Sequence, residues 1–241
     1  MKPNVSVQKF KSLDELSQAA AREFVQIVTK SVNTHGQCLV ALSGGSTPTR
    51  LYKLLANEKV DWPRVHFFWG DERCVPADDD GNNYGQAKKV LFDKIDLPLE
   101  NIHRVKSDLE PQAAAEEYSA TLKHFAIAPL DWPRFDIVLL GMGDDGHTAS
   151  LFPNSPIDKD KPVIAVTAHY QDRPANRVSL TELVINSAKN IFFLVSGAGK
   201  AETLKRVLSD AHTPDELPAQ RIDPVKGRTV WFVDEDAARF L

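Results

Sequence analysis

The chain has 241 residues, with 29 Lys and Arg against 33 Asp and Glu, and a formal net charge of -4 at pH 7. This mild acidity, without a Lys/Arg-rich block, argues against a nucleic-acid-binding protein, whose affinity rests on many basic contacts to phosphate. No apolar run could span a bilayer, and the N-terminus lacks the apolar segment of a signal peptide. We therefore expect a cytoplasmic protein with no membrane or nucleic-acid partner.

The predicted elements begin with a helix, because Ser12-Leu13-Asp14-Glu15 forms a capping-box pattern and the periodic apolar stripe after it continues to about Val32. Short apolar runs and helical segments then alternate along the chain. The runs that predict strands are Cys38–Leu42, Val65–Trp69, Phe135–Leu140, Val163–Ala168, Ile191–Val195 and Thr229–Val233. Further helices are predicted at Thr49–Asn57, Asn83–Phe92, Pro111–Phe125 and Lys200–Leu208.

The apolar strands predict the fold class. In a run such as Phe135–Leu140 the single polar residue is Asp136 and neither face is polar, which is typical of a parallel sheet covered by helices on both sides. We predict one α/β domain over residues 1–241, doubly wound and Rossmann-like, with a mostly parallel sheet. In such sheets ligands bind at the carboxyl ends of the strands, near the point where the strand order reverses. The motifs that follow the predicted strands are therefore the candidates for a site.

The first such motif is a glycine-rich turn after the first predicted strand. It consists of Ser43, Gly44, Gly45, Ser46 and Thr47, and a proline and a predicted helix follow it. Glycines allow the backbone to approach an anion closely, and the hydroxyls and free N–H groups at a helix N-terminus supply donors. This turn is a candidate phosphate site.

The second motif carries Asp71, Glu72 and Arg73 after the strand Val65–Trp69. Two acids and an arginine are costly to bury without partners. The arginine could hold a phosphate, and a carboxylate could hold a sugar hydroxyl or a catalytic group. Taken alone, the motif is equally compatible with a solvated turn whose charges pair among themselves.

The third motif is the most informative, and it follows the most apolar strand. Its glycines, Gly143 among them, flank an Asp pair and predict a tight turn that exposes Asp145 and His147 together. Histidine titrates near neutral pH, which suits a general base. A nearby aspartate can orient the imidazole ring. We expect this pair to be catalytic.

Two single cations complete the pattern. Arg177 begins an Arg-Val-Ser-Leu segment, and Lys200 follows a glycine turn at the start of a predicted helix. A lysine in that position can reach an anion as a point charge. On their own, both would be ordinary surface cations.

Together these motifs closely resemble the 6-phosphogluconolactonase family over nearly the whole chain. Ser-Gly-Gly-Ser-Thr-Pro, Gly-Asp-Glu-Arg-Cys-Val-Pro and Gly-Met-Gly-Asp-Asp-Gly-His-Thr-Ala-Ser-Leu-Phe-Pro occur in order. The resemblance implies hydrolysis of 6-phospho-D-glucono-1,5-lactone and a fold shared with glucosamine-6-phosphate deaminases. Members of the family are often monomeric, so we expect a monomer, with a homo-oligomer as the alternative. The resemblance further implies no metal and no organic cofactor, and the sequence has no metal-ligand spacing.

The resemblance also implies roles for the candidate residues. The Ser43–Thr47 turn, Arg73, Arg177 and Lys200 would hold the substrate phosphate, while Asp71, Glu72 and Gly143 would complete the substrate site. His147 would take a proton from water, and Asp145 would orient it.

Two alternatives remain open. An amino-sugar-phosphate deaminase or isomerase would share the Asp-Gly-His core and an acid matching Asp71. Those enzymes carry Glu-Pro after the histidine, where this chain has Phe152-Pro153, so the acid that assists ring opening is absent. A non-catalytic sugar-phosphate sensor could reuse the fold, although such domains usually accompany a DNA-binding module. The Asp145 and His147 pair argues for chemistry instead.

Overall fold

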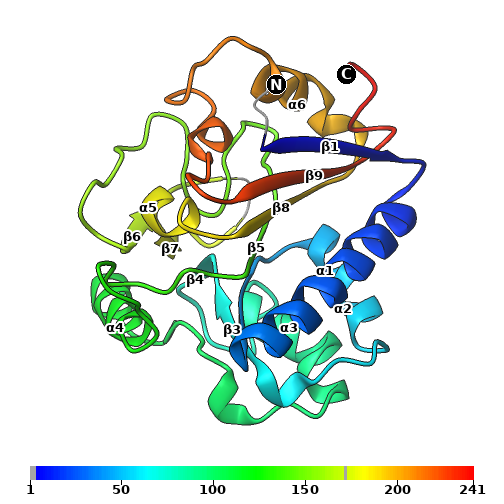
Figure 1. The fold of residues 1–241 in the computed structure, drawn as a ribbon. Coiled ribbons are helices and arrows are strands. Elements are labelled where there is room, and N and C mark those ends of the chain that lie inside the picture. Colours follow the sequence, from blue (N-terminus) through cyan, green and yellow to red (C-terminus); the bar gives the residue numbers. More distant parts are fainter. Residues whose placement is uncertain (1–3, 171–172) are drawn as a thin grey trace.

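The computed structural model describes residues 4–170 and 173–241, and Figure 1 shows how its helices and strands are arranged. The strands are β1 (Val5–Phe10), β2 (Cys38–Leu42), β3 (Val65–Trp69), β4 (Asp71–Arg73), β5 (Ile137–Leu140), β6 (Val163–Thr167), β7 (Asn176–Leu180), β8 (Asn190–Val195) and β9 (Arg228–Asp234). The α-helices are α1 (Leu13–His35), α2 (Ser46–Leu55), α3 (Asn83–Val90), α4 (Pro111–Lys123), α5 (Glu182–Ile185) and α6 (Ala201–Leu208).

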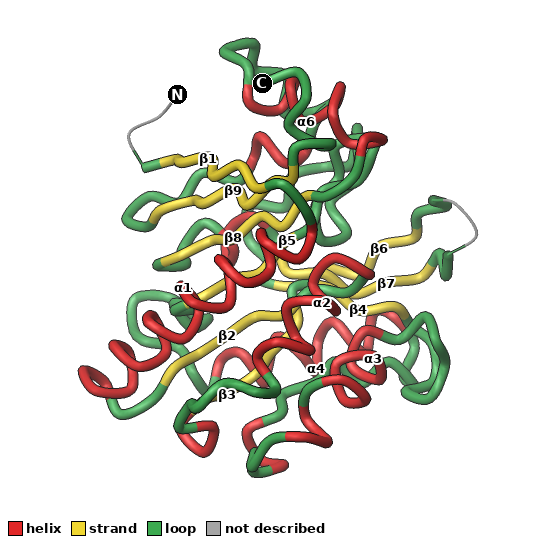
Figure 2. Tube along the Cα trace, turned by 90° about the vertical axis from the view of Figure 1, so that its right-hand side faces the viewer, coloured by secondary structure: helices red, strands yellow, loops and turns green. Residues whose placement is uncertain are grey.

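The central sheet has six strands in the order β1-β9-β8-β5-β2-β3, and every neighbouring pair is parallel. Figure 2 shows this order from top to bottom. The predicted α/β fold with a mostly parallel, doubly wound sheet is confirmed. Strand β1 was not predicted, and it pairs with β9 from the other end of the chain, as the blue and red arrows of Figure 1 show.

Side chains alternate between the two faces of this sheet, so each central strand contributes to two cores. Val40 and Ile137 pack in the core formed with α1, α2 and α3. Leu39 and Val138 pack in the core formed with α4, α5 and α6. Because both faces are buried, the strands need apolar residues on both faces, and this explains their nearly continuous apolar runs.

Helix α1 begins and ends as local rules predict. The side chain of Ser12 accepts the N–H of Glu15 at its start. At its end, Gly36 adopts the left-handed conformation with φ 77°, and its N–H donates to the carbonyl of Val32. None of the described helices combines the length and apolar character needed to cross a bilayer.

A second, three-stranded sheet in the order β4-β7-β6 lies beside the central sheet, and its neighbouring strands are antiparallel. It appears to the right of the central sheet in Figure 2. The predicted strand Val163–Ala168 is present as β6 (Val163–Thr167), but it lies in this antiparallel sheet and not in the parallel one. A short apolar run indicates a buried strand, but its partners are chosen by long-range packing. Strands β4 and β7 were not predicted.

The strand order reverses at β2. The chain proceeds from β2 to β3 on one side, whereas β5, which comes later, pairs with β2 on the other side. Ser43 follows β2 and Gly141 follows β5. The first and third motifs therefore meet at the switch point, where α/β sheets bind their ligands.

Candidate active site

A polar cavity of about 170 Å³ lies at the carboxyl ends of β2, β5 and β8, and one side of it is formed by the second sheet. Its lining comes from segments that are distant in sequence. The lining residues are Ser43, Gly44, Gly45, Ser46, Thr47, Pro48, Asp71, Arg73, Gly141, Met142, Gly143, His147, Ala149, Tyr170, Arg173, Arg177, Leu194, Val195, Ser196 and Lys200.

The glycine turn after β2 presents the start of α2 to this cavity. Gly45 is the N-cap with φ 105°, a conformation that favours glycine, and no side chain caps the helix. The hydroxyl of Tyr52 fixes the turn, because it accepts a hydrogen bond from the N–H of Ser43 at 3.1 Å and donates one to the carbonyl of Ser43 at 2.7 Å. The Ser43 hydroxyl itself has no hydrogen-bond partner among the described residues. An anion placed here would meet free donors and the positive end of the helix dipole.

Asp145 and His147 form a hydrogen-bonded pair at the turn after β5. The His147 Nδ1 atom lies 2.6 Å from Oδ1 of Asp145, which also accepts the His147 backbone N–H at 3.1 Å. A carboxylate only accepts, so Nδ1 is the donor, and in the neutral imidazole Nε2 remains as an acceptor. Burial raises the pKa of Asp145, but the hydrogen bond and the charge of His147 outweigh it and lower that pKa. The pair has the arrangement of a general base and its orienting carboxylate.

A glycine is required at position 143, because the side chains of Asp145 and His147 lie very close to it. A Cβ atom at Gly143 would lie 2.2 Å from Nδ1 of His147 and 2.4 Å from Oδ1 of Asp145. The backbone N–H of Gly143 also donates to the carbonyl of His147 at 2.8 Å, which closes the turn. The glycine therefore provides the space in which the pair forms.

Aromatic rings surround the imidazole. The rings of Phe152 and Tyr170 each have their centroids 4.6 Å from that of His147. The Tyr170 hydroxyl donates to Asp144, and burial together with this acceptor raises the pKa of Tyr170 to about 12. Tyr170 and Arg173 come from the connection between β6 and β7, which carries no motif. Sequence reasoning missed both residues for that reason.

Two buried arginines from the second sheet face the cavity. Arg73 in β4 is paired in register with Arg177 in β7. The Nη1 atom of Arg73 donates to the carbonyl of Gly81, whereas its Nε has no partner within residues 4–170 and 173–241. The Nε and Nη2 atoms of Arg177 are likewise unpartnered there, and its guanidinium lies 5.5 Å from the ring centre of Phe152. Burial lowers the pKa of Arg177.

Lys200 supplies a third predicted cation. It ends a short 3-10 helix, η4 (Ala198–Lys200), and caps the start of α6. Burial lowers the pKa of Lys200, while the charges of Asp144 and Asp145 oppose that shift. The cavity thus combines several cations with an Asp–His pair.

The two acids of the second motif have different surroundings. Asp71 lines the cavity, and its Oδ2 accepts the hydroxyl of Ser150 at 2.7 Å. Glu72 is buried outside the cavity lining, and its carboxylate accepts the backbone N–H groups of residues 73, 83 and 84 at 2.7 to 2.8 Å. Glu72 thereby fixes the start of α3 against β4. All of the predicted site residues line the cavity except Glu72 and Asp145, and Asp145 is hydrogen-bonded to His147.

This combination defines a class of protein: an α/β protein whose switch-point cavity can bind a small anion and transfer a proton beside it. A family model described as glucosamine-6-phosphate isomerases/6-phosphogluconolactonase matches residues 11–231. The chain belongs to this family.

Named relatives agree with that assignment. The chain is 39% identical to the 6-phosphogluconolactonase of Aggregatibacter actinomycetemcomitans, over 96% of this chain and 98% of the relative. It is 41% identical to the 6-phosphogluconolactonase of Haemophilus influenzae, over 84% of this chain and 87% of the relative. The solved structure of 6-phosphogluconolactonase from Trypanosoma brucei superimposes with a TM-score of 0.85 at 31% identity, covering 100% of this chain and 99% of that one.

Proposed function

We propose that this chain hydrolyses 6-phospho-D-glucono-1,5-lactone to 6-phosphogluconate. The observation that carries the proposal is that His147, hydrogen-bonded to Asp145, lines the same cavity as Arg177, whose Nε and Nη2 atoms have no hydrogen-bond partner among the described residues. A base and an anion site that share one small cavity fit a substrate with a reactive carbonyl and a phosphate. The names of the relatives support the choice of a phosphorylated lactone.

In the proposed mechanism, Nε2 of His147 accepts a proton from water, and the oxygen of that water attacks the lactone carbonyl carbon. The resulting imidazolium is stabilised by Asp145, whose carboxylate accepts from Nδ1. The ester bond to the ring oxygen then breaks, and His147 returns the proton to that oxygen. Water is consumed, the ring opens to a hydroxy acid, and no electron transfer is required.

We assign the phosphate to the cationic side of the cavity. Arg73, Arg177 and Lys200 would pair with its oxygens, and the Ser43–Thr47 turn would donate from its backbone and hydroxyls. Asp71 would accept from a sugar hydroxyl, because its carboxylate lines the cavity and, within the described residues, accepts a hydrogen bond from Ser150 alone.

The site argues against sugar-phosphate isomerisation. Isomerisation would need a further acid beside the histidine to assist ring opening. At that point the chain carries Phe152, a buried apolar ring that packs against the imidazole of His147. The surroundings of His147 therefore favour hydrolysis.

The test is to generate the lactone in situ from glucose 6-phosphate with its dehydrogenase, and to follow 6-phosphogluconate with and without the purified protein. Gluconolactone without phosphate serves as the matched control substrate. We expect strong acceleration that is confined to the phosphorylated lactone. If the rate with protein equals the spontaneous rate, the lactonase proposal fails. Binding of 6-phosphogluconate without turnover would then indicate a sensor.

A further inference from the structure

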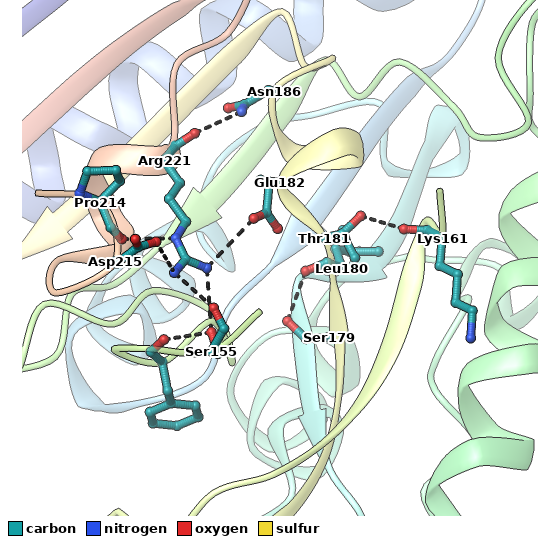
Figure 3. A network of polar contacts seen from close by, with 11 residues as sticks. Ser155, Lys161, Ser179, Leu180, Thr181, Glu182, Asn186, Pro214, Asp215 and Arg221 are labelled. Carbon is teal, nitrogen blue, oxygen red and sulfur yellow. Dashed lines mark hydrogen bonds and ion pairs between the residues drawn. The ribbon is translucent and has the colours of Figure 1, made fainter. Parts of the chain in front are cut away.

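Arg221 lies outside the cavity and connects several loops behind it. It ends the 3-10 helix η5 (Pro218–Arg221), and its side chain is only 3% exposed. Nε donates to the carbonyl of Pro214 at 2.9 Å, and Nη2 donates to the carbonyl of Ser155 at 3.0 Å. Figure 3 shows the guanidinium between these loops and α5.

The charge of Arg221 is balanced by two acids. The guanidinium lies 3.8 Å from Oε1 of Glu182, a buried carboxylate with no hydrogen-bond partner among the described residues, and 3.5 Å from Oδ1 of Asp215. Removing one member of a buried ion pair leaves the other uncompensated, which is strongly destabilising. Arg221 and Glu182 therefore have to be replaced together in a clean test.

The first connection from Arg221 to the proposed active site runs through Ser155. The backbone N–H of Ser155 donates to the carbonyl of Phe152 at 3.0 Å, and its hydroxyl donates to the same carbonyl at 2.6 Å. The ring of Phe152 packs against the imidazole of His147 and lies beneath the guanidinium of Arg177. Arg221 thus fixes the segment that supports one face of the imidazole.

The second connection runs through η5 itself. The N–H of Ala219 donates to the carbonyl of Gly146 at 3.0 Å, directly before His147. Gly146 has φ 86°, and a Cβ there would lie 2.7 Å from Cδ2 of Leu217. The segment that Arg221 anchors is therefore packed tightly against the turn that carries the Asp–His pair.

We propose that Arg221 is a positioning residue for His147: by joining residues 152–155 to residues 214–221, it fixes both the ring beneath the imidazole and the turn that carries it. Arg221 touches no proposed reacting atom. The inference rests on the proposed function, because it takes His147 as the base.

The test compares the double variant Arg221→Met/Glu182→Gln, which removes the charge pair, with Arg221→Lys, which keeps the charge but not the forked geometry. The matched control is Arg134→Met. Arg134 also joins two loops, through the carbonyls of Ser187 and Lys226, without contacting the His147 turn. Misplacement by about 1 Å can cost about 100-fold in rate. We expect kcat to fall about tenfold or more in the double variant, with KM within about twofold.

A spectroscopic readout separates positioning from general stability. The ¹⁵N shifts of His147 report whether Nδ1 keeps its proton, and we expect the Arg221 variants to change them while Arg134→Met does not. If a folded Arg221 variant kept the wild-type kcat and the wild-type His147 shifts, the inference would be overturned. Arg221→Lys supplies that comparison if the double variant does not fold. Because the shifts need no substrate, they test the positioning even if the lactonase proposal fails.

Discussion

Arg73 and Arg177 face each other directly across the antiparallel strands β4 and β7, although both are buried and positively charged. Like charges in opposite positions of a sheet are destabilising, and unpartnered guanidinium atoms add a desolvation cost. An arrangement of this kind is expected where a bound anion completes the site. Binding of the anion then offsets the unfavourable repulsion and desolvation of the two guanidinium groups in the free protein.

The first prediction concerns this pair. Arg177→Met should raise KM for the phosphorylated lactone about tenfold to 100-fold, because a hydrogen bond to a charged group contributes about 1.5–3 kcal/mol. The free variant should be no less stable than the wild type, and 6-phosphogluconate should raise its Tm less. Steady-state kinetics and thermal unfolding check this, with Arg50→Met, at an exposed ion pair with Asp14, as the control. An unchanged KM would show that Arg177 does not bind the phosphate.

The second prediction concerns the base. His147→Ala should lower kcat about 100-fold to 10,000-fold, the range for the loss of a general base. Asp145→Asn should also lower kcat, because the amide can donate to Nδ1 and so favour the tautomer with the proton on Nε2. Single-turnover kinetics measure both effects, with the exposed His212→Ala as the control. Wild-type kcat in His147→Ala would assign the base to another group.

The third prediction concerns the space at the turn. In Gly143→Ala the new Cβ would overlap His147 and Asp145, so the pair would have to separate. We expect kcat to fall about 100-fold, as for a misplaced catalytic group. The matched control is Gly199→Ala, where a Cβ meets nothing within 4 Å. Equal activity of the two variants would show that the contact at Gly143 does not matter.

The fourth prediction concerns Glu72. Burial raises the pKa of its carboxyl from 4.5 to about 7, although three backbone N–H groups oppose the shift. The unfolded chain loses this proton near pH 4.5 and the folded chain only near pH 7, so the stabilising contribution is complete below pH 4.5 and is lost as pH rises to 7. The loss amounts to about 3 kcal/mol.

Glu72→Gln should abolish this loss, because the neutral amide resembles the protonated acid. Urea unfolding at several pH values between 4.5 and 8 measures the free energy of unfolding of both proteins. The exposed Glu116→Gln serves as the control and should keep the wild-type pH dependence. If Glu72→Gln showed the same slope as the wild type, the carboxyl of Glu72 would titrate normally in the folded protein.

Local sequence features predicted much of the fold. The apolar runs of β2, β3, β5, β8 and β9 placed the central strands, because a sheet buried on both faces requires apolar residues on both faces. The capping pattern placed the start of α1. The edge strand β1 was missed, since its exposed and half-buried positions give no continuous apolar run.

Local sequence was sufficient to specify the Asp145–His147 turn, because the two partners lie two residues apart and the surrounding glycines permit the backbone conformation that the turn requires. The arrangement of the second motif depends on long-range packing. Asp71, Glu72 and Arg73 form a strand, and successive side chains of a strand point to opposite faces. Asp71 and Arg73 therefore line the cavity while Glu72 does not. That strand exists because β7 pairs with it from about 100 residues away, and local propensity does not specify such long-range pairing.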